Sequence, residues 1–170
     1  KLPSEYVPKE DRGNFTVIVD GPQGASYSYM KQYMDEIETR LMPLVDSGEI
    51  LRLLVRAPRG FGGGAAFNTG QVTVVLNSWD QRRSAWEILA DVRGRLADLP
   101  GVTAFPVMRQ GIGGRQRKPV EFVIGGGTYE EMAEWRDLIF EKINQNNPGF
   151  LALDSDYKEN KPQVRVVIDY

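Results

Sequence analysis

One pattern of strand and helix signals fills the chain as far as residue 108 and then begins again after residue 118. The stretch between, residues 109–118, has no apolar period and is rich in glycine and arginine, which predicts a solvated connector. The start of the first helix, Tyr27-x-x-Met30, recurs as Tyr129-x-x-Met132, and the apolar positions that follow share one helical phase. We therefore expect one complete folding unit followed by the beginning of a second copy.

The first unit carries six predicted elements in the order βαββαβ. Alternating apolar residues predict a strand over 15–19, and an apolar stripe at helical spacing predicts a helix that Ser26 or Ser28 caps and that Ser47-Gly48 ends. Further elements are expected as strands at 50–56, 71–76 and 102–107 and as a helix opened by a capping box at Ser84. This order predicts an α+β, ferredoxin-like fold, in which Pro106 marks an edge strand or a bulge.

The second unit is predicted to be an incomplete copy with the order βαββ. Val120, Phe122 and Ile124 alternate as in a strand, and Thr128-x-x-Glu131 is a capping box at the start of a helix. Strands are expected at 150–153 and 164–168, so the last helix and strand of the plan are missing. The three tryptophans of the chain are predicted to lie in a core or an interface: Trp79, Trp86 and Trp135.

Composition excludes several kinds of chemistry. The chain has no cysteine and no histidine, which removes thiol nucleophiles, Ser-His-Asp relays and imidazole or thiolate metal sites. No set of residues that could act together in catalysis remains, so we expect no enzyme and no cofactor. The acidic residues at 154, 156 and 159 are typical of a solvated turn, so we expect no metal site. The net charge of −2 gives no basis for general polyanion binding. No apolar run is long enough to span a membrane, and because the chain begins with Lys1 we expect a processed product or an excised piece.

The stretch between the second and third strands, residues 58–70, is the candidate for a functional loop. Its three consecutive glycines allow backbone conformations that other residues avoid, and aromatic residues flank them. Such a loop is either a plain connector or a gate for apolar ligands. Arg59-Gly-Phe-Gly62 also matches the first half of an RNA-recognition signature, which leaves a free-standing ligand- or RNA-binding module as the alternative. The glycines and alanines that follow, where that signature needs aromatics, weigh against RNA.

Six short motifs occur in the order found in one transporter family. The sequence resembles the periplasmic porter region of the resistance-nodulation-division (RND) efflux transporters, in the hydrophobe and amphiphile exporter branch. The resemblance implies a first C-terminal porter subdomain over residues 1–108, the connector at 109–118, and the start of a second subdomain over 119–170, cut where the docking domain would insert. The motifs are Leu2-Pro-x-Glu5, Pro8 to Gly13, Pro22 to Ser26, Gly60-Phe-Gly62 with Asn68-Thr-Gly70, Lys118 to Phe122, and a weaker Pro162-Gln163 with Ile168-Asp169.

The resemblance implies a periplasmic part of a proton-driven pump in a bacterial inner membrane. In the family, a cleft between the two subdomains admits small amphiphilic or hydrophobic substrates, and the pump is a homotrimer that works with a periplasmic adaptor and an outer-membrane channel. Multidrug members carry a second aromatic and an arginine in the loop, where this chain has Gly63-Gly64-Ala65. The candidate gating residues are Phe61, Gly62, Gly63, Gly64 and Phe67, and the candidate cleft walls are Phe105 and Met108.

Overall fold

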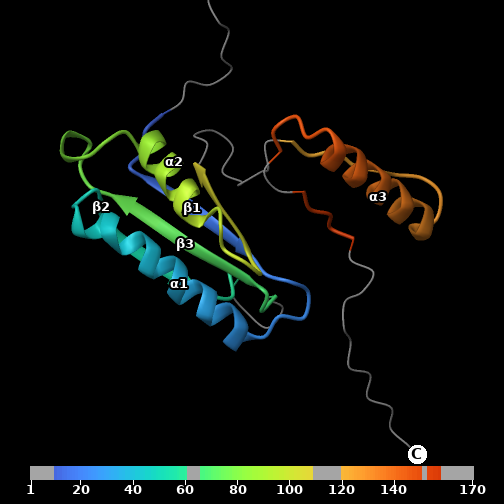
Figure 1. Cartoon of the computed structure of the whole chain (residues 1–170), viewed down its shortest axis with the longest axis horizontal. Helices are drawn as coiled ribbons and strands as arrows, with labels where there is room; N and C mark the ends of the chain where they lie inside the picture. Colours follow the sequence, from blue (N-terminus) through green and yellow to red (C-terminus); the bar gives the residue numbers. More distant parts are fainter. Residues whose placement is uncertain (1–9, 61–65, 109–119, 151–152, 158–170) are drawn as a thin grey trace, which may run out of the picture. The chain divides into compact units, whose positions relative to one another are not determined.

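The computed structural model describes residues 10–60, 66–108, 120–150 and 153–157 (Figure 1). The chain divides into two compact units, residues 1–116 and residues 117–170. This division falls within the predicted connector.

The first unit is a four-stranded antiparallel sheet with two α-helices. The strands lie in the order β2-β3-β1-β4, so the sheet joins segments that are far apart in the sequence. The α+β class predicted from the sequence is confirmed. The elements, in chain order, are β1 (Asn14–Asp20), α1 (Tyr27–Asp46), β2 (Ile50–Arg56), β3 (Thr69–Leu76), the short 3₁₀ helix η1 (Trp79–Gln81), α2 (Ala85–Leu96) and β4 (Thr103–Met108).

The predicted helix starts and the predicted edge strand are confirmed. Ser26 caps α1 by accepting a hydrogen bond from the backbone N–H of Tyr29, and Ser84 opens α2 with a complete capping box. Strand β4 pairs with β1 alone among the described strands, so Pro106 lies on a sheet edge, where its missing N–H costs no ladder bond in the interior.

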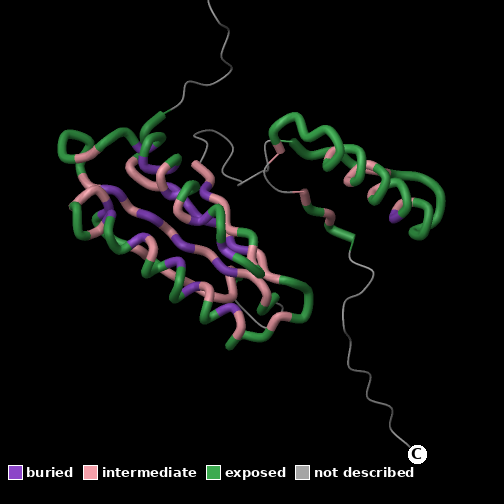
Figure 2. Tube along the Cα trace, in the orientation of Figure 1, coloured by how far each residue is buried: buried purple, intermediate pink, exposed green. Residues whose placement is uncertain are grey.

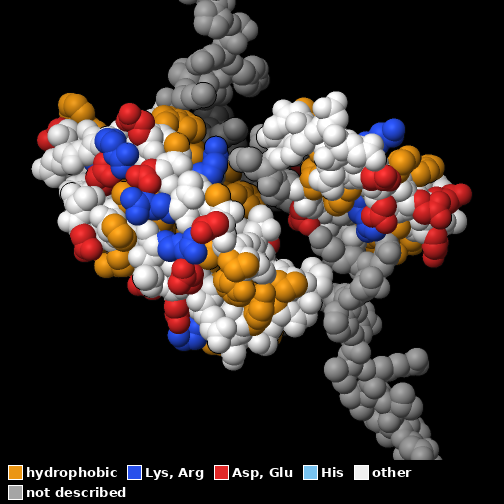
Figure 3. All heavy atoms as spheres, viewed as in Figure 1, with side chains coloured by type: hydrophobic (Ala, Val, Ile, Leu, Met, Phe, Trp, Pro, Cys, Tyr) orange, Lys and Arg blue, Asp and Glu red, His pale blue; other side chains and the backbone are white. Residues whose placement is uncertain are grey.

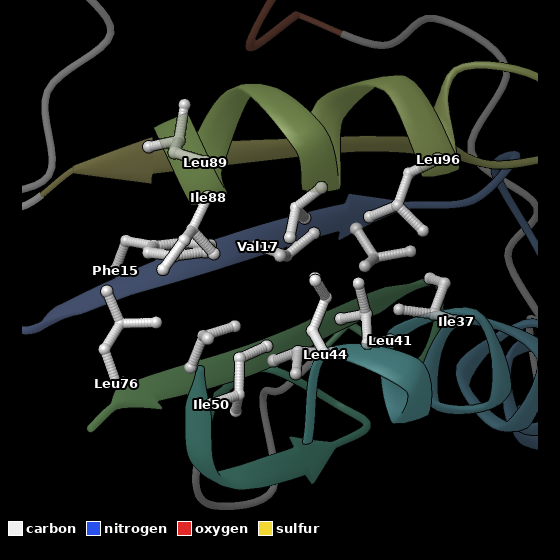
Figure 4. Close-up of a cluster of buried hydrophobic side chains, with 14 of the residues drawn as sticks. Phe15, Val17, Ile37, Leu41, Leu44, Ile50, Leu76, Ile88, Leu89 and Leu96 are labelled. Atoms are coloured by element: carbon white, nitrogen blue, oxygen red, sulfur yellow. The ribbon is translucent and has the colours of Figure 1, made fainter. Parts of the chain in front are cut away.

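One face of the sheet forms the core with both helices. Phe15, Val17 and Val19 of β1 are fully buried, and every second residue of β3 is buried on the same face. Figure 4 shows side chains of α1 and α2 pointing toward Phe15 and Val17. Both helices cover this face, and no helix among the described residues of the first unit covers the opposite face, although Thr16 on that face is only 2% exposed.

An ion pair between Asp11 and the buried side chain of Arg82 ties the lead-in segment, residues 10–13, to the start of α2. The Arg82 guanidinium, whose side chain is 3% exposed, donates to both carboxylate oxygens of Asp11 at 2.8 Å. The same carboxylate accepts the backbone N–H groups of Ala85 at 2.8 Å and Gly13 at 3.0 Å. These donors hold the pKa of Asp11 far below its ordinary value, the Arg82 hydrogen bond contributing most.

Exposed ion pairs cover the helical side of the first unit. Arg83 bridges Glu49 at 2.6 Å and Asp91 at 2.9 Å, and Arg95 also pairs with Asp91. Hydrogen bonds from these arginines lower the pKa values of both carboxyl groups. Figure 3 shows positive and negative side chains interspersed over this surface. The charges of this side therefore largely balance, and ion pairs as exposed as these contribute little to the stability of the fold.

The second unit is built around one helix, α3 (Tyr129–Gln145). The predicted capping box of Thr128 and Glu131 is confirmed. Ala133 is the single buried residue among the described positions of this helix, and most of the others are exposed (Figure 2). Among the described residues of this unit, the apolar stripe of α3 therefore has no sheet of the kind that the repeat predicts.

The strand predicted over 120–124 is wrong, because these residues form no strand in the structure. A strand needs a neighbour for its backbone groups, and the described residues of this unit supply none. The strand predicted at 150–153 is not formed at its described ends, Phe150 and Leu153. The remainder of that segment and the whole of 164–168 lie outside the described residues.

The tryptophans do not lie in a core. Trp79 is 82% exposed on η1, and Trp86 and Trp135 are 37% and 44% exposed. The core prediction is therefore wrong for all three, and the interface prediction remains. The size and apolar character of a tryptophan do not by themselves predict burial. Trp79 belongs to the short helix η1 and not to the apolar stripe of a longer helix.

Candidate functional site

The loop between β2 and β3 has a base that hydrogen bonds hold together. The Thr69 side-chain oxygen accepts the backbone N–H of Arg59 at 3.2 Å and donates to the carbonyl of Ala66 at 2.7 Å. The backbone N–H of Thr69 donates to the same carbonyl at 3.1 Å. One threonine therefore ties the entering and leaving arms of the loop to each other.

The same base is tied to the turn that leads from β1 into α1. Asn68 and Gly21 exchange two hydrogen bonds, from the Gly21 N–H to the Asn68 carbonyl at 2.8 Å and from the Asn68 amide to the Gly21 carbonyl at 3.2 Å. Arg59 lies 3.4 Å from the Asp20 carboxylate. The loop is thus anchored on the end of the central strand β1.

Two glycines let this base lie directly on α1. A Cβ at Gly21 would come within 2.5 Å of the Met30 sulfur, and a Cβ at Gly70 would come within 2.5 Å of the Met34 sulfur. Both methionines are buried core residues. Sequence reasoning missed these positions, although a glycine inside a strand, as at Gly70, is a known sign of close approach.

The structure describes some of the predicted gate and cleft residues. Phe61 and Gly62 to Gly64 lie outside the described residues. Phe67 lies at the leaving arm of the loop and is 60% exposed. Phe105 and Met108 are both on β4, but three positions separate them, so they lie on opposite faces of the sheet. Met108 pairs with Phe15 and packs against the core, so the structure does not bring it together with Phe105.

The face of the sheet opposite α1 and α2, here called the open face, is a second surface of the first unit. Pairing aligns its residues in rows that cross all four strands. One row contains Arg56, Gln71, Ile18 and Phe105, and the next contains Leu54, Thr73, Thr16 and Val107.

These rows argue against the RNA-binding alternative. An RNA-recognition sheet stacks bases on aromatic side chains of its two central strands. The central strands here are β3 and β1, which present Gln71, Thr73, Thr16 and Ile18 to the open face. None of these side chains is aromatic, so none can stack on a base. The central strands therefore lack the aromatic residues that would have to accompany the partial signature at Arg59 in an RNA-binding sheet.

The second unit contains an apolar groove of about 420 Å³ along α3. Tyr129 stacks on Tyr157 at its rim, with ring centroids 5.5 Å apart, and Arg136 donates to the Tyr157 carbonyl at 3.3 Å. Asp154 and Asp156 also line it, but the described residues contain no cluster of acidic or other ligand side chains that would hold a metal ion.

Comparison with known proteins identifies the class of protein to which the chain belongs, the RND transporter proteins. The family model described as "AcrB/AcrD/AcrF family" matches residues 1–170. The chain belongs to this family, which confirms the resemblance drawn from the motifs. No helix among the described residues has both the length and the apolar character needed to cross a membrane.

Three curated relatives are named "Multidrug resistance protein MdtC". The one from Proteus mirabilis is 28% identical over 171 residues, that from Photorhabdus laumondii is 25% identical over 174, and that from Yersinia enterocolitica is 23% identical over 172. Each alignment covers at least 98% of this chain. The chain spans 16% of the length of each relative.

Proposed function

We propose that this chain is a periplasmic part of a proton-driven efflux pump of a bacterial inner membrane, where it forms part of the substrate entry cleft and the switch loop. Small amphiphilic or hydrophobic molecules are the substrates. The full-length protein works as a homotrimer with a periplasmic adaptor and an outer-membrane channel. Membership in the AcrB/AcrD/AcrF family supports this proposal, as does the name of the relatives, multidrug resistance protein.

The proposal divides the chain into two porter subdomains. Residues 1–108 are a complete ferredoxin-like subdomain, which the element order βαββαβ and the strand order β2-β3-β1-β4 support. Residues 109–118 are the connector. Residues 119–170 begin the second subdomain, and the capping box that opens α3 at the position equivalent to the start of α1 supports the repeat.

The single observation that carries the switch-loop role is the tied base of the loop. Thr69 and Asn68 fix both arms to β1 and to each other, so a movement of the tip does not have to disturb the sheet. The glycines at 62–64 give the tip backbone freedom at low steric cost. A fixed base with a permissive tip is what a gate beside a cleft requires.

The test shortens the loop tip in the full-length transporter. Deleting Gly63 and Gly64 should slow export of a fluorescent amphiphile from efflux-deficient cells, while the amount of transporter in the membrane stays the same. Gly94→Ala is the matched control, because a Cβ there meets nothing within 4 Å. Export at the unmodified rate after the deletion would contradict the switch-loop role.

A further inference from the structure

The two arms of the loop between β2 and β3 are not held equally. The entering arm, residues 57–60, leaves the sheet at once, since Arg56 is the last residue of β2 that pairs with β3. The leaving arm, residues 66–70, stays in the sheet for longer, because Thr69 and Gly70 still pair with β1. Among the described residues, a neighbouring strand therefore holds the leaving arm at two positions and the entering arm at none.

The leaving arm is also fixed outside the strand ladder. Asn68 and Gly21 exchange two hydrogen bonds, at 2.8 Å between backbone groups and at 3.2 Å from the Asn68 amide. Gly70 is buried, and it lies so close to α1 that a Cβ there would come within 2.5 Å of the Met34 sulfur. Moving this arm would break strand pairing and uncover part of the core.

Arg59 holds the entering arm with two contacts. Its backbone N–H donates to the Thr69 side-chain oxygen at 3.2 Å, and its guanidinium lies 3.4 Å from the Asp20 carboxylate at the end of β1. The Arg59 and Asp20 side chains are 36% and 35% exposed, so water and salt weaken the attraction between their charges. Both contacts can break while every strand keeps its pairing.

We propose that the loop opens from its entering arm, with the Arg59–Asp20 pair as a releasable latch and the leaving arm as a fixed hinge. The inference rests on the proposed switch-loop role and states which side of the loop moves. Arg59 and Asp20 are positioning residues in this account, because they act by holding the entering arm against the end of β1. Opening the latch breaks one exposed ion pair and one hydrogen bond, whereas opening the hinge breaks ladder bonds and exposes apolar side chains.

The test is amide hydrogen exchange, followed by NMR at pH 7 and corrected for the intrinsic exchange rate of each residue. The Arg59 N–H reports on the latch and the Gly21 N–H on the hinge, because they donate to Thr69 and Asn68 respectively. The Gly21 amide should be protected at least about tenfold more than the Arg59 amide. D20N removes the carboxylate charge and should speed exchange at Arg59 about two- to fivefold, as expected for the loss of an exposed ion pair.

Two further variants separate the latch from a general effect of charge. D20E keeps a carboxylate at the end of β1 and should return exchange at Arg59 to nearly the unmodified rate. D80N removes an exposed carboxylate from η1, which follows the opposite end of β3, and should leave exchange at Arg59 unchanged. The Val17 amide of the central strand β1 should be far better protected than Arg59 in every variant, which shows that Arg59 opens without unfolding of the sheet.

Equal protection of Arg59 and Gly21 would mean that the arms open together, and would overturn the proposal. Unchanged exchange at Arg59 in D20N, or an equal acceleration in D80N, would overturn the latch. The deletion of Gly63 and Gly64 tests the proposed function separately. Slowed export after that deletion, together with equal protection of Arg59 and Gly21, would refute the latch alone, whereas the expected exchange pattern with unchanged export would support the latch and contradict the switch-loop role.

Discussion

The ion pair between Asp11 and Arg82 makes a quantitative prediction about how the lead-in segment is held. Asp11→Ala removes both acceptors of a guanidinium that is 3% exposed and also leaves the Ala85 N–H without its acceptor. Removing one partner of a fully buried pair costs about 3–5 kcal/mol. The Asp11 side chain is 30% exposed, which admits water to the site, so we expect the lower value of about 2–3 kcal/mol.

The assay is urea unfolding followed by tryptophan fluorescence, with Asp11→Ala, Arg82→Ala and the double variant forming a thermodynamic cycle. The coupling free energy should be about 2 kcal/mol. Glu10→Ala is the control in the same segment, because Glu10 pairs with Arg12 at the surface and its loss should cost less than about 0.5 kcal/mol. Equal costs for Asp11→Ala and Glu10→Ala, or a coupling near zero, would refute the assignment of this pair as the fastening of the lead-in.

Acid should weaken the same contact. Because the folded state lowers the pKa of Asp11 below its ordinary value of 3.8, the unfolded chain takes up a proton more readily. The contribution is complete well above pH 3.8 and is lost as the pH falls through the folded pKa. The stability difference between the unmodified chain and Asp11→Asn should therefore shrink as the pH falls below about 4, and a constant difference would contradict the assigned contact.

Further predictions concern the core and the helices. Ile37→Ala removes a fully buried side chain and should lower the free energy of unfolding by about 2–4 kcal/mol in the same urea assay. Gly101→Ala should lower the free energy of unfolding by at least about 1–2 kcal/mol, because φ is +82° there and a Cβ would lie 2.5 Å from two tyrosine hydroxyls. Gly94→Ala in α2 should raise it by up to about 1 kcal/mol, because a Cβ there meets nothing within 4 Å. A loss of stability at both positions would contradict this reasoning. In hydrogen exchange, amides of α3 should exchange much faster than those of α1, since α1 buries five residues and α3 one among the described positions; equal protection would show that α3 is packed after all.

Much of the first unit could be predicted from the sequence because its signals are local. The capping residues Ser26 and Ser84 act on backbone groups three positions away, so their spacing is sufficient to place the helix starts. Pro106 lacks a donor wherever it lies, which limits its strand to an edge or a bulge, and β4 is an edge strand. These features depend on neighbours in the chain and need no knowledge of the fold.

The candidate site was only partly predictable, because local sequence signals do not show which distant residues come into contact. The glycine loop could be singled out from composition, but its anchoring by Asn68 and Gly21 joins positions that only the sheet brings together. Phe105 and Met108 are both predicted cleft walls at the end of the fourth strand. The pleat of β4 sends them to opposite faces, so Met108 packs with the core instead.

The sequence by itself determined the order of elements in the first unit, the helix caps and the family, since these follow from residue spacing and from motifs. Tertiary structure decided which face of the sheet stays open, and it placed Arg52, Leu54 and Phe105 on that face. It also decided that residues 120–124 form no strand, because a strand depends on a partner and not on its own alternation. The physical reason is that pairing and burial are properties of surfaces that meet, and distant segments of the chain supply the two sides.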